Sequence, residues 1–367
     1  MGISALVISN LDRFVEMREL WDMELSEHVD DPYLFSCLLI EHWKIGQKLG
    51  WHPFLIVFTL NGKIVGFAPL MMRSSFGFKQ VCTFDQYTYP NFFFDKYREV
   101  CVDIMVSFLF RHLKCKTANI VCENGSANER MLKEVCRNRG FSYSSYPQIG
   151  QAFIATIQSI DSFRHSLKKK DRKKFAKIRG KLDGLGSWHI SRYNVNSNSI
   201  AKIWAVERFS WKDNLEGKEK ALKNWDLEHT LSKLQNIDEY ASFFDPEIWT
   251  LELNGVPLSY ILAMKRNKTV FFAKTSYDAR YKHLSPGLFL MNDLIERVFT
   301  DMMAEKIDFM TALPFMEVWK PRIKKRSVIT ISSNQFFSKA HHLVFENRLS
   351  RKLLQIGERL RWQKRLD

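Results

Sequence analysis

The segment Ser285-Pro286-Gly287 combines three residue types that together could hold a phosphate group. Serine favours the position before a helix, and proline suits the first helical position because its missing N–H would have no acceptor there. Glycine lets another group approach the backbone closely. The N–H groups of Gly287, Leu288 and Phe289 would point out of the helix start, where the helix dipole favours an anion. The tripeptide by itself favours an ordinary capped helix, so its place in the topology decides between the two interpretations.

Two carboxylates could take a proton from a reacting group. Asp308 lies between Ile307 and Phe309 in a strand pattern, and partial burial there would raise its pKa. Glu207 lies in a helical pattern four residues before Trp211, so both side chains are expected on one helix face. The alternatives are a structural carboxylate tied to Lys or Arg for Asp308, and a surface carboxylate for Glu207.

No metal or nucleotide motif accompanies these residues. Histidines such as His189 and His283 show no metal-binding spacing, and no GxSxG elbow, Walker loop or GxGxxG is present. The six cysteines all lie in the first half of the chain, and none forms a CxxC pair. We therefore expect no metal, and reduced, mostly buried thiols.

An approximate duplication supplies the elements that must position the candidate residues. Asn61-Gly62 and Asn254-Gly255 each lie between apolar runs, which predicts two β-hairpins with type I′ turns. Each half is expected to follow the order α-α-β-β-β-α-β. Helices are expected at 10–27, 33–49, 96–112, 126–139, 197–212, 218–237 and 286–304, and further strands near 79–84, 117–122, 141–146, 269–275 and 306–311.

The net charge of +15 is concentrated in two segments. Residues 164–181 hold ten Lys or Arg against one Asp, and residues 319–367 hold thirteen against three acidic residues. Such local excess indicates contacts with phosphates, acidic lipid headgroups or nucleic acid, or else a solvated face. In the first segment an apolar stripe predicts a basic helix that joins or bridges the halves: Phe163, Leu167, Phe175, Ile178 and Leu182.

The length of 367 residues favours two domains, because single cores rarely keep growing beyond this size. We expect an N-terminal lobe at 1–155, a basic linker helix at 156–186, a C-terminal lobe at 187–335 and a basic amphipathic helix at 336–367. The predicted fold class is α/β (α+β), with two similar lobes that each have a mixed central sheet.

Four further segments are informative together with this order of helices and strands: SLKKKDRKKFAKIRGKL at 166–182, ERFSWK at 207–212, YDARYKHLSPGLFL at 277–290 and DFMTALPFMEVWK at 308–320. They resemble the two-lobed acyltransferases of the GNAT fold, namely the cellulose-biosynthesis (CelD-type) acetyltransferases and the related Fem-type transferases. The order of helices and strands given above is that of the GNAT fold. In two places the chain departs from the pattern, with Ala312 or Leu313 where the family has Gly and Trp319 where it has Tyr.

The resemblance implies an enzyme that moves an acyl group from acyl-CoA, with residues 285–289 holding the coenzyme A pyrophosphate. Acyl transfer needs a base for the acceptor, for which Asp308 and Glu207 are candidates. Tyr277 could protonate the leaving thiolate. Lys320 could pair with a phosphate or with the developing oxyanion, although the basic run around it is equally typical of a solvated tail.

The corresponding connection in the first half contains no glycine, because DQYTYPNFFFDKYREV fills this place with bulky side chains. We therefore expect one cofactor site, in the C-terminal lobe, and an N-terminal lobe that shapes the acceptor cleft. The acceptor is expected to be a small molecule or a glycan precursor. The residues expected to contact it are Asp85, Tyr87, Trp211, Lys212 and Trp319.

Residues 337–367 interleave apolar with basic residues, which is typical of a helix that lies on an anionic membrane or packs on its own domain. No run of eighteen apolar residues and no secretory signal is present, so we expect a cytoplasmic protein, peripheral at the inner face of the membrane if this helix binds lipid.

Two other classes of function stay open. One is a Fem-like aminoacyl transferase that takes its acyl group from aminoacyl-tRNA, for which the basic helix would suit RNA. The other is a non-catalytic protein that uses the duplicated fold for binding. Salt dependence would discriminate RNA from coenzyme A, because RNA binding weakens steeply as salt rises.

Overall fold

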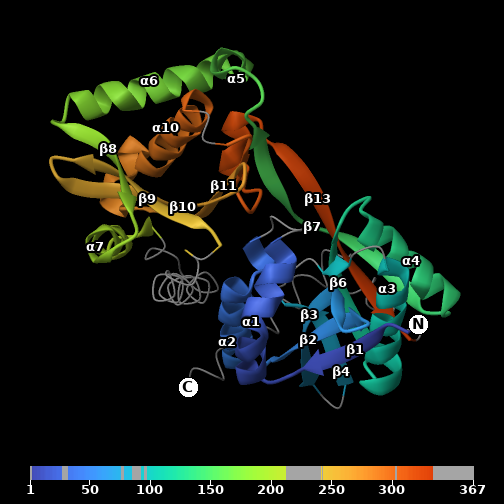
Figure 1. Ribbon diagram of the computed structural model, residues 1–367. Helices are drawn as coiled ribbons and strands as arrows, with labels where there is room; N and C mark the ends of the chain where they lie inside the picture. Colours follow the sequence, from blue (N-terminus) through green and yellow to red (C-terminus); the bar gives the residue numbers. More distant parts are fainter. Residues whose placement is uncertain are drawn as a thin grey trace. The chain divides into compact units, whose positions relative to one another are not determined.

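The computed structural model describes residues 2–26, 32–75, 78–84, 92–94, 97–211, 241, 243–301 and 304–333 (Figure 1). The chain divides into two compact units. The first unit consists of residues 1–149 and 325–367, and the second of residues 150–324. Among the described residues no helix has the length and apolar character needed to cross a membrane.

The first unit is built on the sheet order β1-β2-β3-β4-β6-β13, in which only β4 and β6 run parallel. The helices and strands expected for the first half are all present. Its elements are β1 (Ser4–Ile8), α1 (Leu11–Ser26), η1 (Pro32–Leu34), α2 (Ser36–Lys48), β2 (His52–Leu60), β3 (Lys63–Ser75), β4 (Phe78–Thr83), β5 (Phe93–Phe94), α3 (Arg98–Ser107), η2 (Phe108–His112), β6 (Thr117–Glu123) and α4 (Ala127–Asn138), with parts of β7 (Ser142–Ala155) and β13 (Arg322–Ser332).

The second unit repeats this plan with the order β7-β12-β11-β10-β9-β8, and its parallel pair is β11 and β12. The helix expected at 218–237 lies outside the described residues. The elements are α5 (Ile160–Ser166), α6 (Lys169–Asp183), β8 (Trp188–Asn194), α7 (Ser197–Glu207), β9 (Asp245–Leu253), β10 (Val256–Arg266), β11 (Thr269–Tyr277), η4 (Ala279–Leu284), α10 (Pro286–Thr300), β12 (Lys306–Asp308) and η5 (Pro314–Trp319).

Both expected hairpins form. Asn61 and Gly62 have φ of 52° and 79°, and Asn254 and Gly255 have φ of 50° and 79°. These are the left-handed conformations that a type I′ turn needs at both central residues. The turns join β2 to β3 and β9 to β10.

Each unit contains a strand from the other half of the sequence. Residues 326–332 of β13 pair with β6 in the first unit, and residues 153–155 of β7 pair with β12 in the second. The compact units therefore differ from the expected lobes at 1–155 and 187–335. The pairing partner of a strand far along the chain leaves no local mark in the sequence, so the exchange could not be read from it.

The basic segment forms two helices rather than one. Leu167 is extended, with φ −69° and ψ 146°, and separates α5 from α6. Both helices belong to the second unit and bury apolar side chains in the core around α10: Phe163 from α5, and Phe175, Ile178 and Leu182 from α6.

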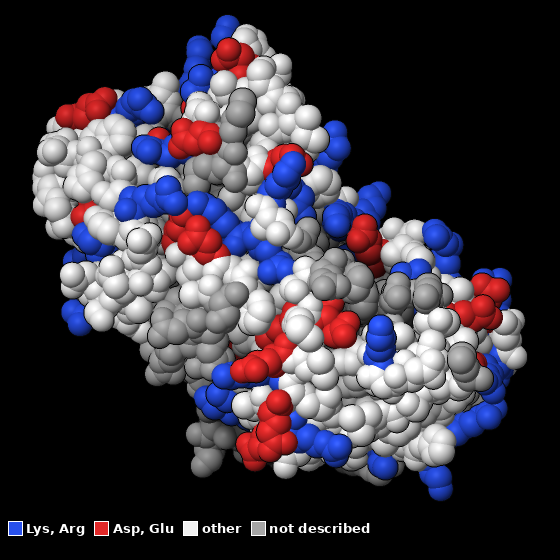
Figure 2. All heavy atoms as spheres, viewed as in Figure 1, with Lys and Arg blue, Asp and Glu red and all other residues white. Residues whose placement is uncertain are grey.

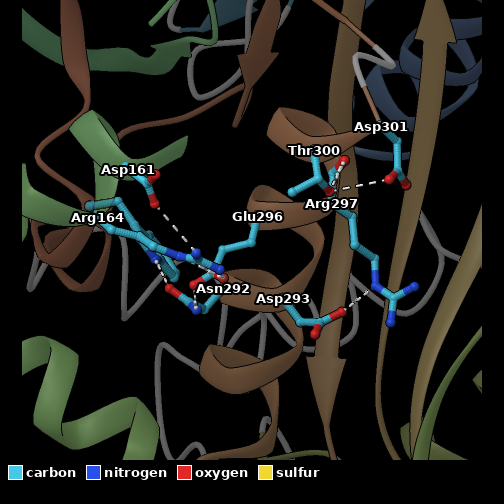
Figure 3. Close-up of polar contacts among 9 residues, drawn as sticks. Asp161, Arg164, Asn292, Asp293, Glu296, Arg297, Thr300 and Asp301 are labelled. Carbon is cyan, nitrogen blue, oxygen red and sulfur yellow. Dashed lines mark hydrogen bonds and ion pairs between the residues drawn. The ribbon is translucent and has the colours of Figure 1, made fainter. Parts of the chain in front are cut away.

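A polar chain fastens α5 and η5 to α10 (Figure 3). Arg164 of α5 forms an ion pair with Glu296 of α10. Asn292 donates to Glu296 (3.0 Å) and accepts from Nε1 of Trp319 in η5 (3.0 Å). On the other side of α10, Arg297 donates to Asp293 (2.5 Å). These contacts fix the helix whose N-terminus carries the Ser-Pro-Gly segment.

Candidate functional site

The parallel strands β11 and β12 pair only along part of their length. Their register ends at Phe271 and Asp308, although β11 continues to Tyr277. A shift in the β10–β11 register between Leu262 and Ala263 leaves Ala273 as an extra residue in β11. After Asp308 the chain no longer pairs with β11, and the last six residues of β11 extend beyond this point to the loop that leads to α10.

The N-terminus of α10 follows this parting. Its first residue is Pro286, and Phe289 donates its N–H to the carbonyl of Ser285 (3.1 Å). Helix geometry therefore leaves the N–H groups of Gly287 and Leu288, rather than three groups, without a helical acceptor. Ser285 precedes the helix as expected, but it is left-handed (φ 48°, ψ 50°) and its side chain makes no capping hydrogen bond.

Gly287 faces the ring of Tyr277 at the end of β11. A Cβ at position 287 would lie 3.5 Å from Cδ1 of Tyr277, which is ordinary contact. Alanine therefore fits at this position, whereas a large side chain would run into the ring of Tyr277 and disturb the helix start. This arrangement suits a small anionic group, as the sequence predicted for a phosphate.

An aromatic pair stands beside this helix start. The rings of Trp211 and Tyr277 are stacked, with centroids 6.3 Å apart and planes at 13°. Ala279 donates its N–H to the carbonyl of Phe209 (2.7 Å), so the segment 209–211 runs along the end of β11. Burial raises the pKa of the Tyr277 phenol above its ordinary value of about 10. The phenol therefore stays protonated and uncharged at neutral pH.

Glu207 lies on the other face of the sheet. It is the last residue of α7 and accepts a hydrogen bond from the hydroxyl of Tyr260, a fully buried residue of β10. Because the helix ends at Glu207, Trp211 does not continue it. The expectation that Glu207 and Trp211 share one helix face is wrong.

Asp308 is enclosed, with 1% of its surface exposed. Its oxygens accept from Nε2 of Gln151 (2.8 and 2.9 Å) and from the N–H of Met310 (2.8 Å), and Lys306 lies 3.2 Å away. This is the environment of a structural carboxylate tied to a lysine, the alternative that the sequence left open.

Lys320 and Trp319 serve the packing of η5 in this structure. The amine of Lys320 donates to the carbonyl of Ser166 at the end of α5. Trp319 is 1% exposed and its ring stacks with Phe175 (6.4 Å) and Phe309 (5.9 Å). An acceptor would not reach this ring, so Trp319 does not have the surface position expected of a substrate-binding residue.

The four candidate catalytic residues do not form one cluster. Asp308 pairs with Phe271, six residues before Tyr277, which is about 20 Å along an extended strand. Glu207 lies on the α7 face, whereas Tyr277 faces α10. The structure brings together Tyr277, Trp211 and Gly287. Three expected acceptor-binding residues lie outside the described residues: Asp85, Tyr87 and Lys212.

Sequence analysis missed Ser259, which pairs with Tyr277 across the β10–β11 ladder. Ser259 is fully buried, and its hydroxyl has no hydrogen-bond partner among the described residues. A serine in a strand gives no sequence signal for such a position. Within the same described part of the chain, no group of His, Cys, Asp or Glu could hold a metal ion.

Comparison with known proteins defines the class of fold. Residues 169–321 match the family model described as an acetyltransferase (GNAT) domain. No curated protein matches the chain in sequence. The matched range lies in the second unit and includes α6, β11, β12 and the start of α10.

Three solved structures are similar in fold over most of the chain. The crystal structure of FemX has a TM-score of 0.58 and 10% identity, over 89% of this chain and 96% of that chain. A conserved protein of unknown function from Bacteroides thetaiotaomicron has 0.54 and 11%, over 90% and 100%. The C-terminal domain (DUF2156) of a putative lysylphosphatidylglycerol synthetase from Agrobacterium fabrum has 0.51 and 11%, over 91% and 97%.

These identities establish the fold and nothing finer. The chain has a mixed α/β, tandem GNAT-like fold. The resemblance to the CelD-type family in particular stays a prediction.

Proposed function

We propose that the protein transfers an acyl group from acyl-CoA to an amine or hydroxyl of a sugar, amino sugar or cell-envelope precursor. The observation that carries the proposal is the end of β11–β12 pairing at Phe271 and Asp308, because the last six residues of β11 then continue without this partner toward the uncapped start of α10. An extended donor could lie along β11 there, with its phosphates at the helix start.

The donor end of the proposed site uses backbone groups. The N–H groups of Gly287 and Leu288 would donate to the pyrophosphate, aided by the helix dipole. Tyr277, whose phenol is uncharged at neutral pH even at its ordinary pKa of about 10, adds no negative charge beside the phosphates. Since Tyr277 contacts the position of Gly287, we assign it to holding the donor and not to protonating the thiolate.

The acceptor must lose a proton as its oxygen or nitrogen attacks the thioester carbon and the C–S bond breaks. Of the two carboxylates, Glu207 is the better base, because it is partly exposed whereas Asp308 is enclosed. Tyr260 would orient it through the hydrogen bond between them. Asp308, enclosed by three donors, would act by fixing the backbone where the strands part.

Thermal unfolding of the full chain with acetyl-CoA and longer acyl-CoAs tests the donor site. A ligand at about 100 times its Kd should stabilise the fold by about 2.7 kcal/mol, which raises the midpoint by several degrees. Gly287→Ala should keep the shift, because its Cβ makes only ordinary contact. Gly287→Trp should abolish it. An equal shift in the Trp variant, or none in the native protein, would contradict the proposal.

The charge of α6 is the one observation that favours the Fem-like alternative, transfer from aminoacyl-tRNA. That function predicts binding of aminoacyl-tRNA whose affinity falls steeply between 50 and about 200 mM salt.

A further inference from the structure

Helix α6 carries a charge that the described residues of its own unit do not neutralise. Its sequence KKDRKKFAKIRGKLD has eight basic residues against two acidic ones, a net charge of +6 (8 − 2). No carboxylate of the described residues forms an ion pair with any of these cations. Over the face shown in Figure 2, acidic and basic side chains are interspersed.

The packing of α6 fixes which way its cations point. Phe175, Ile178 and Leu182 are buried, so the helix cannot rotate about its axis. On one flank, Arg179 lies over the ring of Trp188 (5.9 Å), which directs that flank toward β8.

The opposite flank carries a row of lysines with helical spacing, Lys170, Lys174, Lys177 and Lys181, all exposed. Lys181 donates to the carbonyl of His283 in η4 (3.3 Å), which directs this row toward the loop that precedes Ser285. In Figure 1, α6 runs alongside α10. The lysine row therefore begins beside the candidate phosphate site and leads away from it.

This row of lysines lowers the stability of helix α6 in the protein without a ligand. Lys170 and Lys174, and Lys177 and Lys181, are like charges four residues apart, which destabilises a helix. No carboxylate of the described residues pairs with these four lysines, so an anionic ligand would relieve the repulsion.

We propose that Lys174 and Lys177 bind a second phosphate of the donor, the 3′-phosphate on the ribose of coenzyme A. The inference rests on the proposed function. The pyrophosphate at the start of α10 would leave the adenosine end of the donor near η4. Helix geometry spaces Lys177 and Lys174 about 6 and 10 Å from Lys181 along the axis, within the span of one nucleotide.

Calorimetric titration of the full chain with acetyl-CoA and with 3′-dephospho-acetyl-CoA tests the inference. The native protein should bind acetyl-CoA about tenfold more tightly, because charge-assisted contacts to one phosphate are lost in the dephospho form. In Lys174→Gln/Lys177→Gln the ratio should fall to about one. The ratio should also fall as salt rises.

The matched control is Lys169→Gln/Arg172→Gln, which removes the same charge from other positions of α6 and should keep the native ratio. Equal affinities for the two donors in the native protein, or an unchanged ratio in the Lys174/Lys177 variant, would overturn the inference alone. If the affinity ratio falls to about one in both double variants, the inference is also overturned, because the effect is then one of general charge. If the native protein binds neither acetyl-CoA nor 3′-dephospho-acetyl-CoA, the inference and the proposed function are both contradicted.

Discussion

At the residue scale, Asp308 and Ser259 are both buried polar groups of the second unit, but their energetics differ. Asp308 has donors for its oxygens in Gln151, Met310 and Lys306, so its charge is compensated where it lies. Ser259 has a hydroxyl with no partner among the described residues. Removing a buried group that has hydrogen-bond partners lowers the stability of the fold, because the partners are left unsatisfied. A buried group without a partner itself lowers the stability of the native fold.

Asp308→Ala should destabilise the second unit by about 3 kcal/mol, because it leaves the amide of Gln151 and the ammonium of Lys306 without their acceptor. Urea unfolding measures this. Asp293→Ala is the control, since its helix-surface pair with Arg297 contributes only a few tenths of a kcal/mol. Equal effects of the two changes would show that the Asp308 network is not structural.

Ser259→Ala should instead raise stability by about 1 kcal/mol, seen as a thermal midpoint a few degrees higher. Ser210→Ala, in which a hydroxyl 3.0 Å from the hydroxyl of Ser276 is lost, should lower it. If the Ser259 variant proves less stable than the native protein, its hydroxyl has a partner in the folded chain.

At the element scale, features fixed by one or two residues could be predicted from the sequence. The ends of helices that depend on packing against other elements could not. Asn-Gly between apolar runs predicts both hairpins, because the required left-handed conformation belongs to those two residues alone. The end of α7 at Glu207 and the break between Ser166 and Lys169 depend on packing against other elements. The prediction that Glu207 and Trp211 share one helix face was wrong for this reason. The helix start at Pro286 was predictable because proline itself fixes it.

The two hairpin turns differ in one respect that can be measured. Asn254 also accepts from the N–H of Ser187 (3.0 Å) and donates to the carbonyl of Leu185 (3.3 Å), and so ties the turn to the loop after α6. No such side-chain contact is recorded for Asn61 among the described residues. Asn61→Ala should cost about 1 kcal/mol for its left-handed conformation, and Asn254→Ala about 2–3 kcal/mol. Urea unfolding of the two units would detect the difference, and equal costs would contradict it.

At the scale of the whole molecule, the exchanged strands decide which pieces of the chain can fold. Residues 150–324 include the part of β7 that pairs with β12, together with α5 and α6, whose apolar side chains belong to the core around α10. Residues 187–335, the lobe expected from the sequence, lack all three. The repeat in the sequence indicates two lobes, but because strands are exchanged the boundaries of the compact units fall at other positions in the sequence.

A fragment of residues 150–324 should therefore fold with a cooperative thermal transition and GNAT-like circular dichroism, whereas a fragment of residues 187–335 should not. A cooperative transition in the shorter fragment would show that β7, α5 and α6 are dispensable and that the sequence-based division was correct.

The measurement that tests the central claim most directly is release of coenzyme A thiol from acyl-CoA by the full chain, across a panel of amino sugars and glycan precursors. The account predicts release that requires both donor and acceptor, an acceptor heavier by one acyl group, and loss of both signals in Gly287→Trp and Glu207→Gln. Absence of thiol release with every acyl-CoA, together with acyl transfer from aminoacyl-tRNA, would contradict it.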